Sequence, residues 1–131
     1  MEYISQSAKE TFKIAKEYAA TLKKGDVVLF FGDLGAGKTE FIKGVCEYFG
    51  IKGVTSPTYA YLNVYADFIY HYDFYRFSSE EEAEVLGLTD YFNKDNICLV
   101  EWPEKVLGVL PQTAKKVIIE KTGENRRKIT L

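Results

Sequence analysis

The spacing of apolar residues predicts a helix near the start of the chain. Ser7 and Glu10, three residues apart, have the pattern of a capping box. Two lysines and Gly25 follow the segment and are typical of a helix end. The apolar positions recur at helical spacing and form one stripe: Ala8, Phe12, Ala15, Ala19 and Leu22.

Two continuous apolar runs predict strands that are buried on both faces. They are residues 27–31, Val-Val-Leu-Phe-Phe, and residues 97–100, Ile-Cys-Leu-Val. A glycine-rich turn follows the first run. After it, residues 38–49 are expected to form a helix that ends at Gly50.

Two hairpins are expected in the rest of the chain. Residues 59–65 and 68–74 are rich in aromatic side chains, and the Ala66-Asp67 pair between them suits a turn. By strand alternation, His71, Asp73 and Tyr75 share one face of the second strand.

The second hairpin is expected near the end of the chain, from residues 115–121 and 127–131. Between the two hairpins, Ser78 or Ser79 is expected to cap a short acidic helix over residues 80–86. Strands that alternate with helices predict an α/β fold, and the hairpins make its sheet mixed.

Composition and net charge reduce the number of function classes that fit the chain. Hydrophobic residues make up 47% of the 131 residues, which argues against disorder and fits one domain. The formal net charge is −2, with 17 basic and 19 acidic residues, whereas general nucleic-acid binders are usually strongly basic. Any role with RNA is therefore expected to act through a partner.

Cysteine usage and the N-terminal sequence predict a cytoplasmic protein. Cys46 and Cys98 have apolar neighbours, and two buried reduced thiols are expected rather than a disulfide. A single histidine and the absence of a CxxC pair leave little for a zinc site. The first residues lack the features of a signal peptide, and no apolar stretch approaches the ~20 residues of a membrane span, so no membrane association is expected.

Residues 32–39, Gly-Asp-Leu-Gly-Ala-Gly-Lys-Thr, match the phosphate-binding loop G-x-x-x-x-G-K-[ST] at every fixed position. The glycines let backbone N–H groups surround the phosphates, and the start of the following helix adds positive potential. Lys38 is expected to reach the β- and γ-phosphates, and the Thr39 hydroxyl to bind Mg²⁺. The residues predicted to bind the nucleotide are Asp33, Leu34, Gly35, Ala36, Gly37, Lys38, Thr39 and Glu40.

This loop makes the predicted fold a single P-loop NTPase-like domain over residues 1–131, a three-layer α/β sandwich with a mixed sheet. The guanine-reading N-K-x-D pattern is absent, since residues 93–96 are one residue out of register, and this favours ATP over GTP. A P-loop ATPase also needs acids that hold the Mg²⁺ shell and order the attacking water. Glu101, at the end of an apolar strand, and Asp73 have suitable settings, although each is also compatible with a solvated strand end.

Three further features have both a structural and a functional interpretation. Residues 55–59, Thr-Ser-Pro-Thr-Tyr, fit a first switch loop that senses the γ-phosphate through Ser56 and Thr58, but the pattern by itself favours a plain turn before a strand. His71 is more typical of a structural strand residue than of a catalyst. Trp102, between Glu101 and a proline, indicates a half-exposed site or contact residue.

Taken together, these motifs resemble the TsaE (YjeE) family, the bacterial ATPases required to make threonylcarbamoyladenosine in tRNA. The resemblance extends from about residue 7 to residue 111. One departure is Glu40, where family members commonly have a second hydroxyl. The motifs that carry the resemblance are the phosphate loop, Ser56-Pro57-Thr58-Tyr59, His71-Tyr72-Asp73-Phe74-Tyr75-Arg76, Leu86-Gly87-Leu88 with Asp90-Tyr91-Phe92, and Val100-Glu101-Trp102-Pro103-Glu104.

The resemblance implies an ATPase that needs ATP and Mg²⁺ and hydrolyses ATP slowly alone. It implies docking on the threonylcarbamoyl transferase TsaD and its paralogue TsaB, with tRNA contacted only indirectly. By motif, Lys38 and Thr39 would contact phosphate and metal, Glu101 would belong to the Mg²⁺ shell, and Asp73 would be needed for hydrolysis. Residues 56–58 would form the switch, with Trp102 as a functional neighbour.

Two other function classes remain open from the residues. A small-molecule kinase usually closes an arginine-bearing lid, and this chain has only Arg76, Arg126 and Arg127 and no lid-like insertion. A nucleotide-sensing binding module would not need both Asp73 and Glu101.

Overall fold

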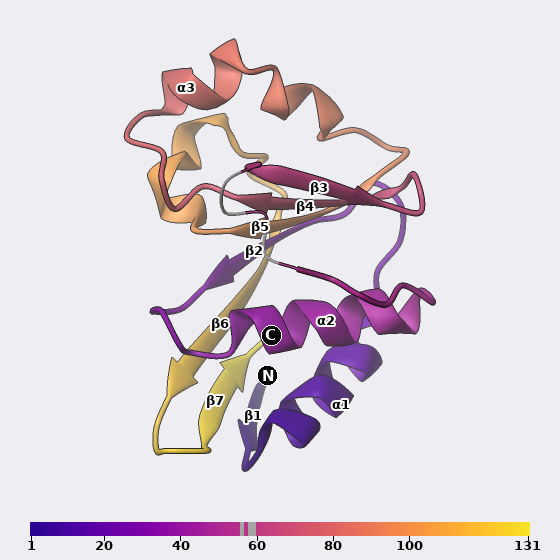
Figure 1. Ribbon diagram of the computed structural model, residues 1–131, viewed down its shortest axis with the longest axis vertical. Coiled ribbons are helices and arrows are strands. Elements are labelled where there is room, and N and C mark those ends of the chain that lie inside the picture. Colours follow the sequence, from indigo (N-terminus) through magenta and orange to yellow (C-terminus); the bar gives the residue numbers. More distant parts are fainter. Residues whose placement is uncertain (56, 58–59) are drawn as a thin grey trace. The chain divides into compact units, whose positions relative to one another are not determined.

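Residues 1–55, 57 and 60–131 are described by the structure, a computed structural model, and they fall into two units (Figure 1). Unit 1 comprises Met1–Leu22, Phe31–Thr55 and Lys116–Leu131, and unit 2 comprises Lys23–Phe30 and Ser56–Lys115. The expectation of a single domain over residues 1–131 stays a prediction.

Unit 1 contains two packed helices, α1 (Ala8–Ala19) and α2 (Lys38–Tyr48). The Ser7 side chain caps α1 by accepting a hydrogen bond from the Glu10 N–H at 3.1 Å, as predicted. The Glu10 carboxylate accepts from the Gln6 N–H instead of the Ser7 N–H, so only half of the expected capping box forms. The two helices approach closely because Gly44 of α2 lies against α1.

Three strands complete unit 1: β1 (Glu2–Ser5), β7 (Arg127–Thr130) and β6 (Lys115–Lys121, of which Lys115 belongs to unit 2). Both pairs are antiparallel, in the order β1-β7-β6. The β6–β7 hairpin has the predicted position. Strand β1 was not predicted, because four residues with mixed burial carry little periodicity and the partner lies at the other end of the chain.

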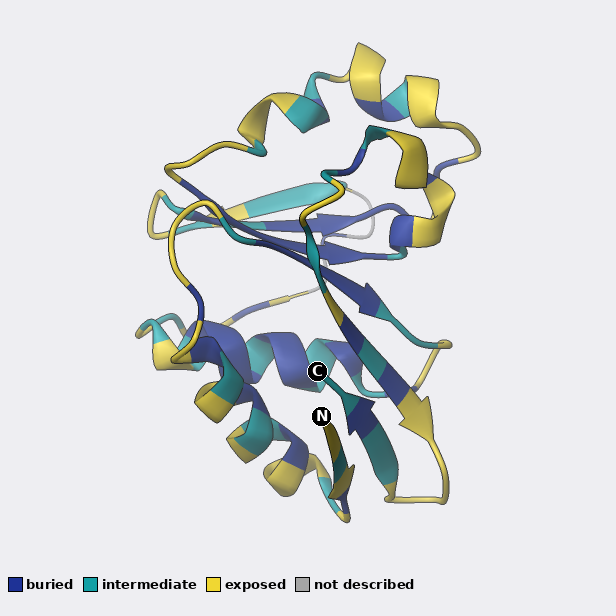
Figure 2. Cartoon of the chain, turned by 180° about the vertical axis from the view of Figure 1, so that it is seen from behind, coloured by how far each residue is buried: buried dark blue, intermediate teal, exposed yellow. Residues whose placement is uncertain are grey.

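Unit 2 contains a mixed sheet in the order β2-β5-β4-β3. Its strands β2 (Val27–Phe31, of which Phe31 belongs to unit 1), β5 (Ile97–Glu101) and β4 (Ile69–Asp73) run parallel, and β3 (Leu62–Tyr65) runs antiparallel to β4. Residues of the three parallel strands are almost all buried (dark blue in Figure 2). This burial explains why β2 and β5 appear in the sequence as continuous apolar runs.

The β3–β4 hairpin turns at Ala66 and Asp67, as predicted. Their φ angles are 51° and 64°, and two successive positive values are the mark of a type I′ turn, whose twist matches that of the paired strands. The aromatic residues of this segment pack together: Tyr72 stacks on Phe74 at 5.5 Å between ring centroids and lies 5.1 Å from Phe92. Burial raises the pKa of the Tyr72 phenol, and its hydroxyl donates to the Leu88 carbonyl.

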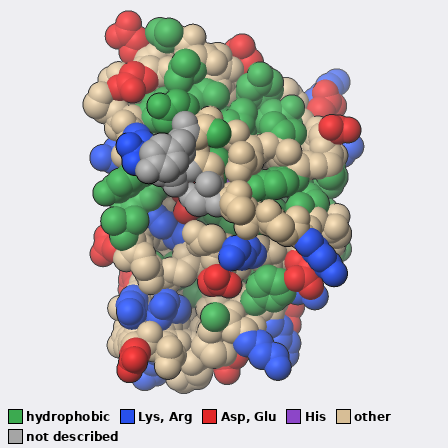
Figure 3. All heavy atoms as spheres, viewed as in Figure 1, with side chains coloured by type: hydrophobic (Ala, Val, Ile, Leu, Met, Phe, Trp, Pro, Cys, Tyr) green, Lys and Arg blue, Asp and Glu red, His purple; other side chains and the backbone are tan. Residues whose placement is uncertain are grey.

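The rest of unit 2 is built from short helices. They are α3 (Glu80–Val85), η1 (Leu88–Tyr91), η2 (Pro103–Lys105) and η3 (Leu107–Val109). Helix α3 is the predicted acidic helix, and Ser79 is its N-cap residue. Several apolar side chains of this unit are exposed, among them Val64, Val85 and Leu86, and Figure 3 shows hydrophobic groups over α3 and β3.

Both cysteines are free and buried, as predicted. Burial raises the pKa of the Cys46 thiol and of the Cys98 thiol to about 12, from an ordinary value of 9.0. Both thiols therefore stay protonated and unreactive near neutral pH. Within the described part of the chain, none of the helices is both long and apolar enough to cross a membrane.

We expect Gly44→Ala to destabilise the protein although alanine is the better helix former. A Cβ at this position would lie 2.6 Å from the Ala15 Cβ and 2.7 Å from the Phe12 carbonyl oxygen, so α1 and α2 must separate. The overpacking cost of typically 1–3 kcal/mol exceeds the gain in helix propensity of about 1 kcal/mol. Urea unfolding measures the difference, with Glu17→Ala on the exposed face of α1 as control. An unchanged midpoint for Gly44→Ala would contradict the close packing.

Candidate functional site

The phosphate loop lies between β2 and α2, as the sequence predicts. Gly35 and Gly37 have φ angles of 79° and 105°, a backbone conformation that residues other than glycine rarely adopt. Gly37 is also the N-cap residue of α2. A glycine has no side chain to accept the N–H groups of the first helical turn, so these donors require another acceptor.

The loop has the properties of a phosphate site. The start of α2 carries the positive end of the helix dipole, and its N–H groups point out of the helix. The Lys38 side chain is only 5% exposed and begins this helix. No described atom lies within 4 Å of where a Gly35 Cβ would be, so the backbone is open to a ligand there. Tri- or diphosphate groups therefore fit the residues that are present.

Two pockets of unit 1 include residues of this loop. One, of about 290 Å³, lies between the loop and β6; the other, of about 80 Å³, lies beside the first turn of α2. The smaller pocket is rich in hydrogen-bonding groups, because Ser7, Thr11, Asn125 and Arg127 line it together with Gly37.

Arg127 of β7 contacts the phosphate loop. Its Nη2 donates to the Gly35 carbonyl at 3.5 Å, and its Nε lies 3.4 Å from where a Gly37 Cβ would be. Its Nη1 donates to the Arg126 carbonyl at 3.1 Å, which helps to hold the guanidinium in place. The sequence does not indicate this residue as part of the site, since no local pattern shows that β7 lies beside a loop 92 residues away.

Unit 2 contains the predicted acids at the ends of its parallel strands. Asp73 of β4 and Glu101 of β5 are register partners, and Glu101 also pairs with Phe30 of β2, two residues before the phosphate loop begins. Glu101 is 4% exposed and Asp73 is 5% exposed. The alternative of a solvated strand end is therefore wrong for both residues.

We call His71, Asp73 and Glu101 the strand-end cluster. The His71 Nε2 and the Glu101 Oε2 are 2.7 Å apart, and both side chains are buried. The Asp73 Oδ1 accepts from the Tyr75 N–H at 2.9 Å. The cluster thus holds two carboxylates by hydrogen bonds that fix their orientation.

Trp102 follows the cluster in an unusual backbone conformation. Its φ of 55° is rare for a bulky residue and is typical of positions held by their surroundings near functional sites. The centroid of its ring lies 4.8 Å from the centroid of the Tyr75 ring. The Lys105 Nζ lies over the Tyr75 ring, 5.8 Å from its centroid. The side chain is half-buried, in agreement with its predicted exposure.

Each of the two residues predicted to bind Mg²⁺ carries the kind of ligand atom that this ion prefers. A hydroxyl and a carboxylate, from Thr39 and Glu101, are hard oxygen ligands, and Mg²⁺ usually keeps several waters and takes only one or two protein carboxylates. Among the described residues, three or more His, Cys, Asp or Glu side chains are nowhere grouped as a metal cage requires. Of the other predicted residues, Ser56 and Thr58 lie outside the described part of the chain.

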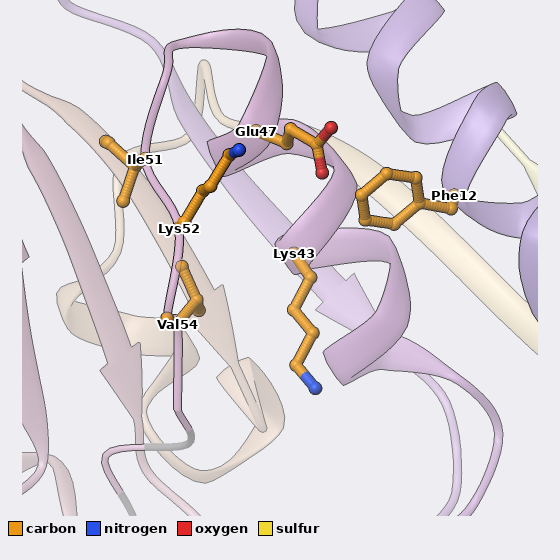
Figure 4. Close-up of a pocket in the computed structure, with 7 residues that line it drawn as sticks. Phe12, Lys43, Glu47, Ile51, Lys52 and Val54 are labelled. Atoms are coloured by element: carbon orange, nitrogen blue, oxygen red, sulfur yellow. The ribbon is translucent and has the colours of Figure 1, made fainter.

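A further pocket of about 250 Å³ lies elsewhere in unit 1 (Figure 4). Phe12 of α1, Lys43 and Glu47 of α2, and Ile51 and Val54 of the following segment line it. It contains no residue of the phosphate loop, so it is separate from the predicted nucleotide site.

A family model matches nearly the whole chain. The family model described as threonylcarbamoyl adenosine biosynthesis protein TsaE matches residues 5–129. A protein of Bacillus subtilis named tRNA threonylcarbamoyladenosine biosynthesis protein TsaE is 42% identical over 99% of this chain and 84% of its own length. A protein of the same name from Haemophilus influenzae is 41% identical over 86% of this chain and 78% of its own length.

The fold also has a solved relative. A crystal structure of YdiB from Bacillus subtilis superposes with a TM-score of 0.83 at 37% identity, over 98% of this chain and 82% of that one. Together with the mixed strand directions of unit 2, this likeness confirms the predicted α/β fold class.

We expect Arg127→Gln to weaken ATP binding by roughly three- to tenfold, because the variant loses a cation beside the phosphate loop in a partly exposed setting. The loss should shrink at high salt, since screening already reduces the contribution of the guanidinium. Calorimetric titration with ATP measures it, and the exposed neighbour Arg126→Gln is the matched control. Equal affinities for the two variants would mean that Arg127 does not act on the phosphates.

Proposed function

The chain belongs to the TsaE family, and from this premise we propose that it is a Mg²⁺-dependent ATPase that supports threonylcarbamoyladenosine modification of tRNA. The two curated relatives are named for the biosynthesis of this modified nucleoside. The resemblance drawn from the motifs is thereby confirmed as to family. We further propose that the protein acts through the TsaB–TsaD complex in the cytoplasm and contacts tRNA only indirectly.

The observation that carries the ATPase proposal is the phosphate loop at the start of α2. Gly35 and Gly37 take the backbone conformation that such a loop requires, and Lys38 begins the helix with its side chain buried. ATP phosphates would accept from the N–H groups of the loop and of the first turn of α2. Lys38 would stabilise the charge that grows on the β- and γ-phosphates during hydrolysis.

The strand-end cluster supports hydrolysis rather than binding alone. Thr39 and Glu101 would hold Mg²⁺, which neutralises phosphate charge when bound. Asp73, with its Oδ1 held by the Tyr75 N–H, would orient the attacking water. A module that only senses nucleotide has no use for two buried carboxylates at adjacent strand ends, because burying them costs free energy.

The loop of residues 55–59 has the role of a nucleotide-dependent switch in this proposal. Its hydroxyls would bind near the γ-phosphate and Mg²⁺, and loss of the γ-phosphate would release it and change the surface offered to the partner. Slow hydrolysis in isolation is expected if the partner completes the site.

We expect the purified chain to hydrolyse ATP slowly, to prefer ATP over GTP, and to be stimulated by the TsaB–TsaD complex. Phosphate release without any added acceptor measures this activity, with Mg²⁺ omitted as control. Release that depends on a small-molecule acceptor would instead support a P-loop kinase. Binding without release under any condition would support a nucleotide-sensing module.

Substitutions separate binding from turnover. Lys38→Ala should abolish ATP binding, whereas Asp73→Asn should retain it and lower kcat by about 100-fold or more, because the water loses its orienting carboxylate. Asp67→Asn is a matched control, since this exposed aspartate lies in the β3–β4 turn at a positive φ that asparagine tolerates. Normal turnover of Asp73→Asn with the partners present would exclude the proposed role of Asp73.

A further inference from the structure

The hydrogen bond between His71 and Glu101 lies in the interior of unit 2. His71 is 0% exposed and Glu101 is 4% exposed, and the Nε2 and Oε2 atoms are 2.7 Å apart. In a water-excluded setting, a hydrogen bond to an ionised acceptor is both short and strong. The other ring nitrogen of His71, Nδ1, is buried and has no hydrogen-bond partner in the described part of the chain.

This arrangement selects one tautomer of the imidazole. An ionised carboxylate can only accept, so Nε2 must carry the proton that forms the bond. In the neutral ring, Nδ1 is then an unsatisfied acceptor, which buried structures tolerate better than an unsatisfied N–H donor. The geometry is therefore met by a ring that carries a proton on Nε2.

We propose that His71 is a positioning residue for Glu101. By donating to Oε2, it fixes the orientation of the carboxylate that would belong to the Mg²⁺ shell. Hydrogen bonds to a ligating carboxylate commonly orient it in this way. This inference rests on the proposed function, and it assigns a role to a residue that the sequence pattern treats as structural.

The tautomer tests the hydrogen bond without any activity measurement. His71 is the only histidine of the chain, so the ¹⁵N spectrum of the labelled, ligand-free protein contains one imidazole. We expect the spectrum of a ring that carries a proton on Nε2 and does not exchange between tautomers. A ring protonated at Nδ1 alone, or an averaged spectrum, would overturn the proposal.

Two substitutions test the positioning itself. Gln places an amide N–H near the position of Nε2, whereas Leu is of similar size and has no donor. His71→Leu should lower kcat and Mg²⁺ affinity by about 10- to 100-fold with little change in the KM for ATP, and His71→Gln should restore most of both. Mg²⁺ affinity is measured by calorimetry with a non-hydrolysable ATP analogue, and urea unfolding of both variants reports any loss of stability.

The outcomes separate this inference from the proposed function. If the wild-type chain hydrolyses ATP with Mg²⁺ and folded His71→Leu matches it in kcat and Mg²⁺ affinity, His71 has no positioning role. Equal losses in the Leu and Gln variants would mean that ring shape and not the donated hydrogen bond matters. A wild-type chain without Mg²⁺-dependent hydrolysis would overturn both proposals, whatever the tautomer.

Discussion

In unit 2 the parallel pairing of β2, β5 and β4 decides where polar groups can lie. The strands are buried on both faces, so their backbone groups pair with one another and apolar side chains fill the space between. Burying a carboxylate costs least free energy where the strands end. The strand register brings Asp73 level with Glu101 there. His71 lies further inside β4, and its side chain pairs with Glu101. Removing either partner leaves the other buried without its hydrogen bond.

The glycines of the phosphate loop are required for different physical reasons, backbone conformation in some and packing in another. Gly35 and Gly37 are required by their positive φ angles, which shape the loop around an anion. Gly32 is required by packing, since a Cβ there would lie 2.6 Å from the Ile119 carbonyl oxygen of β6. One sequence motif therefore records both the chemistry of phosphate binding and the close approach of a neighbouring strand.

Local signals explain which features the sequence could predict. The phosphate loop, the buried strands and the Ala66-Asp67 turn depend on neighbouring residues, and the structure has them where the pattern indicates. The His71–Glu101 bond joins residues 30 apart, and the contact of Arg127 with Gly35 spans 92 residues. Such contacts depend on which strands become neighbours, and one sequence alone carries no signal for that. Strand β1 was not predicted for the same reason, since its partner β7 lies at the other end of the chain.

The position of Trp102 has an optical consequence. It is the only tryptophan of the chain, it follows Glu101 directly, and its half-buried ring lies against Tyr75. Indole can be excited at wavelengths that the ten tyrosines do not absorb. Under such excitation, emission from the unlabelled protein comes from one point at the end of β5, and its wavelength reports the polarity around that ring.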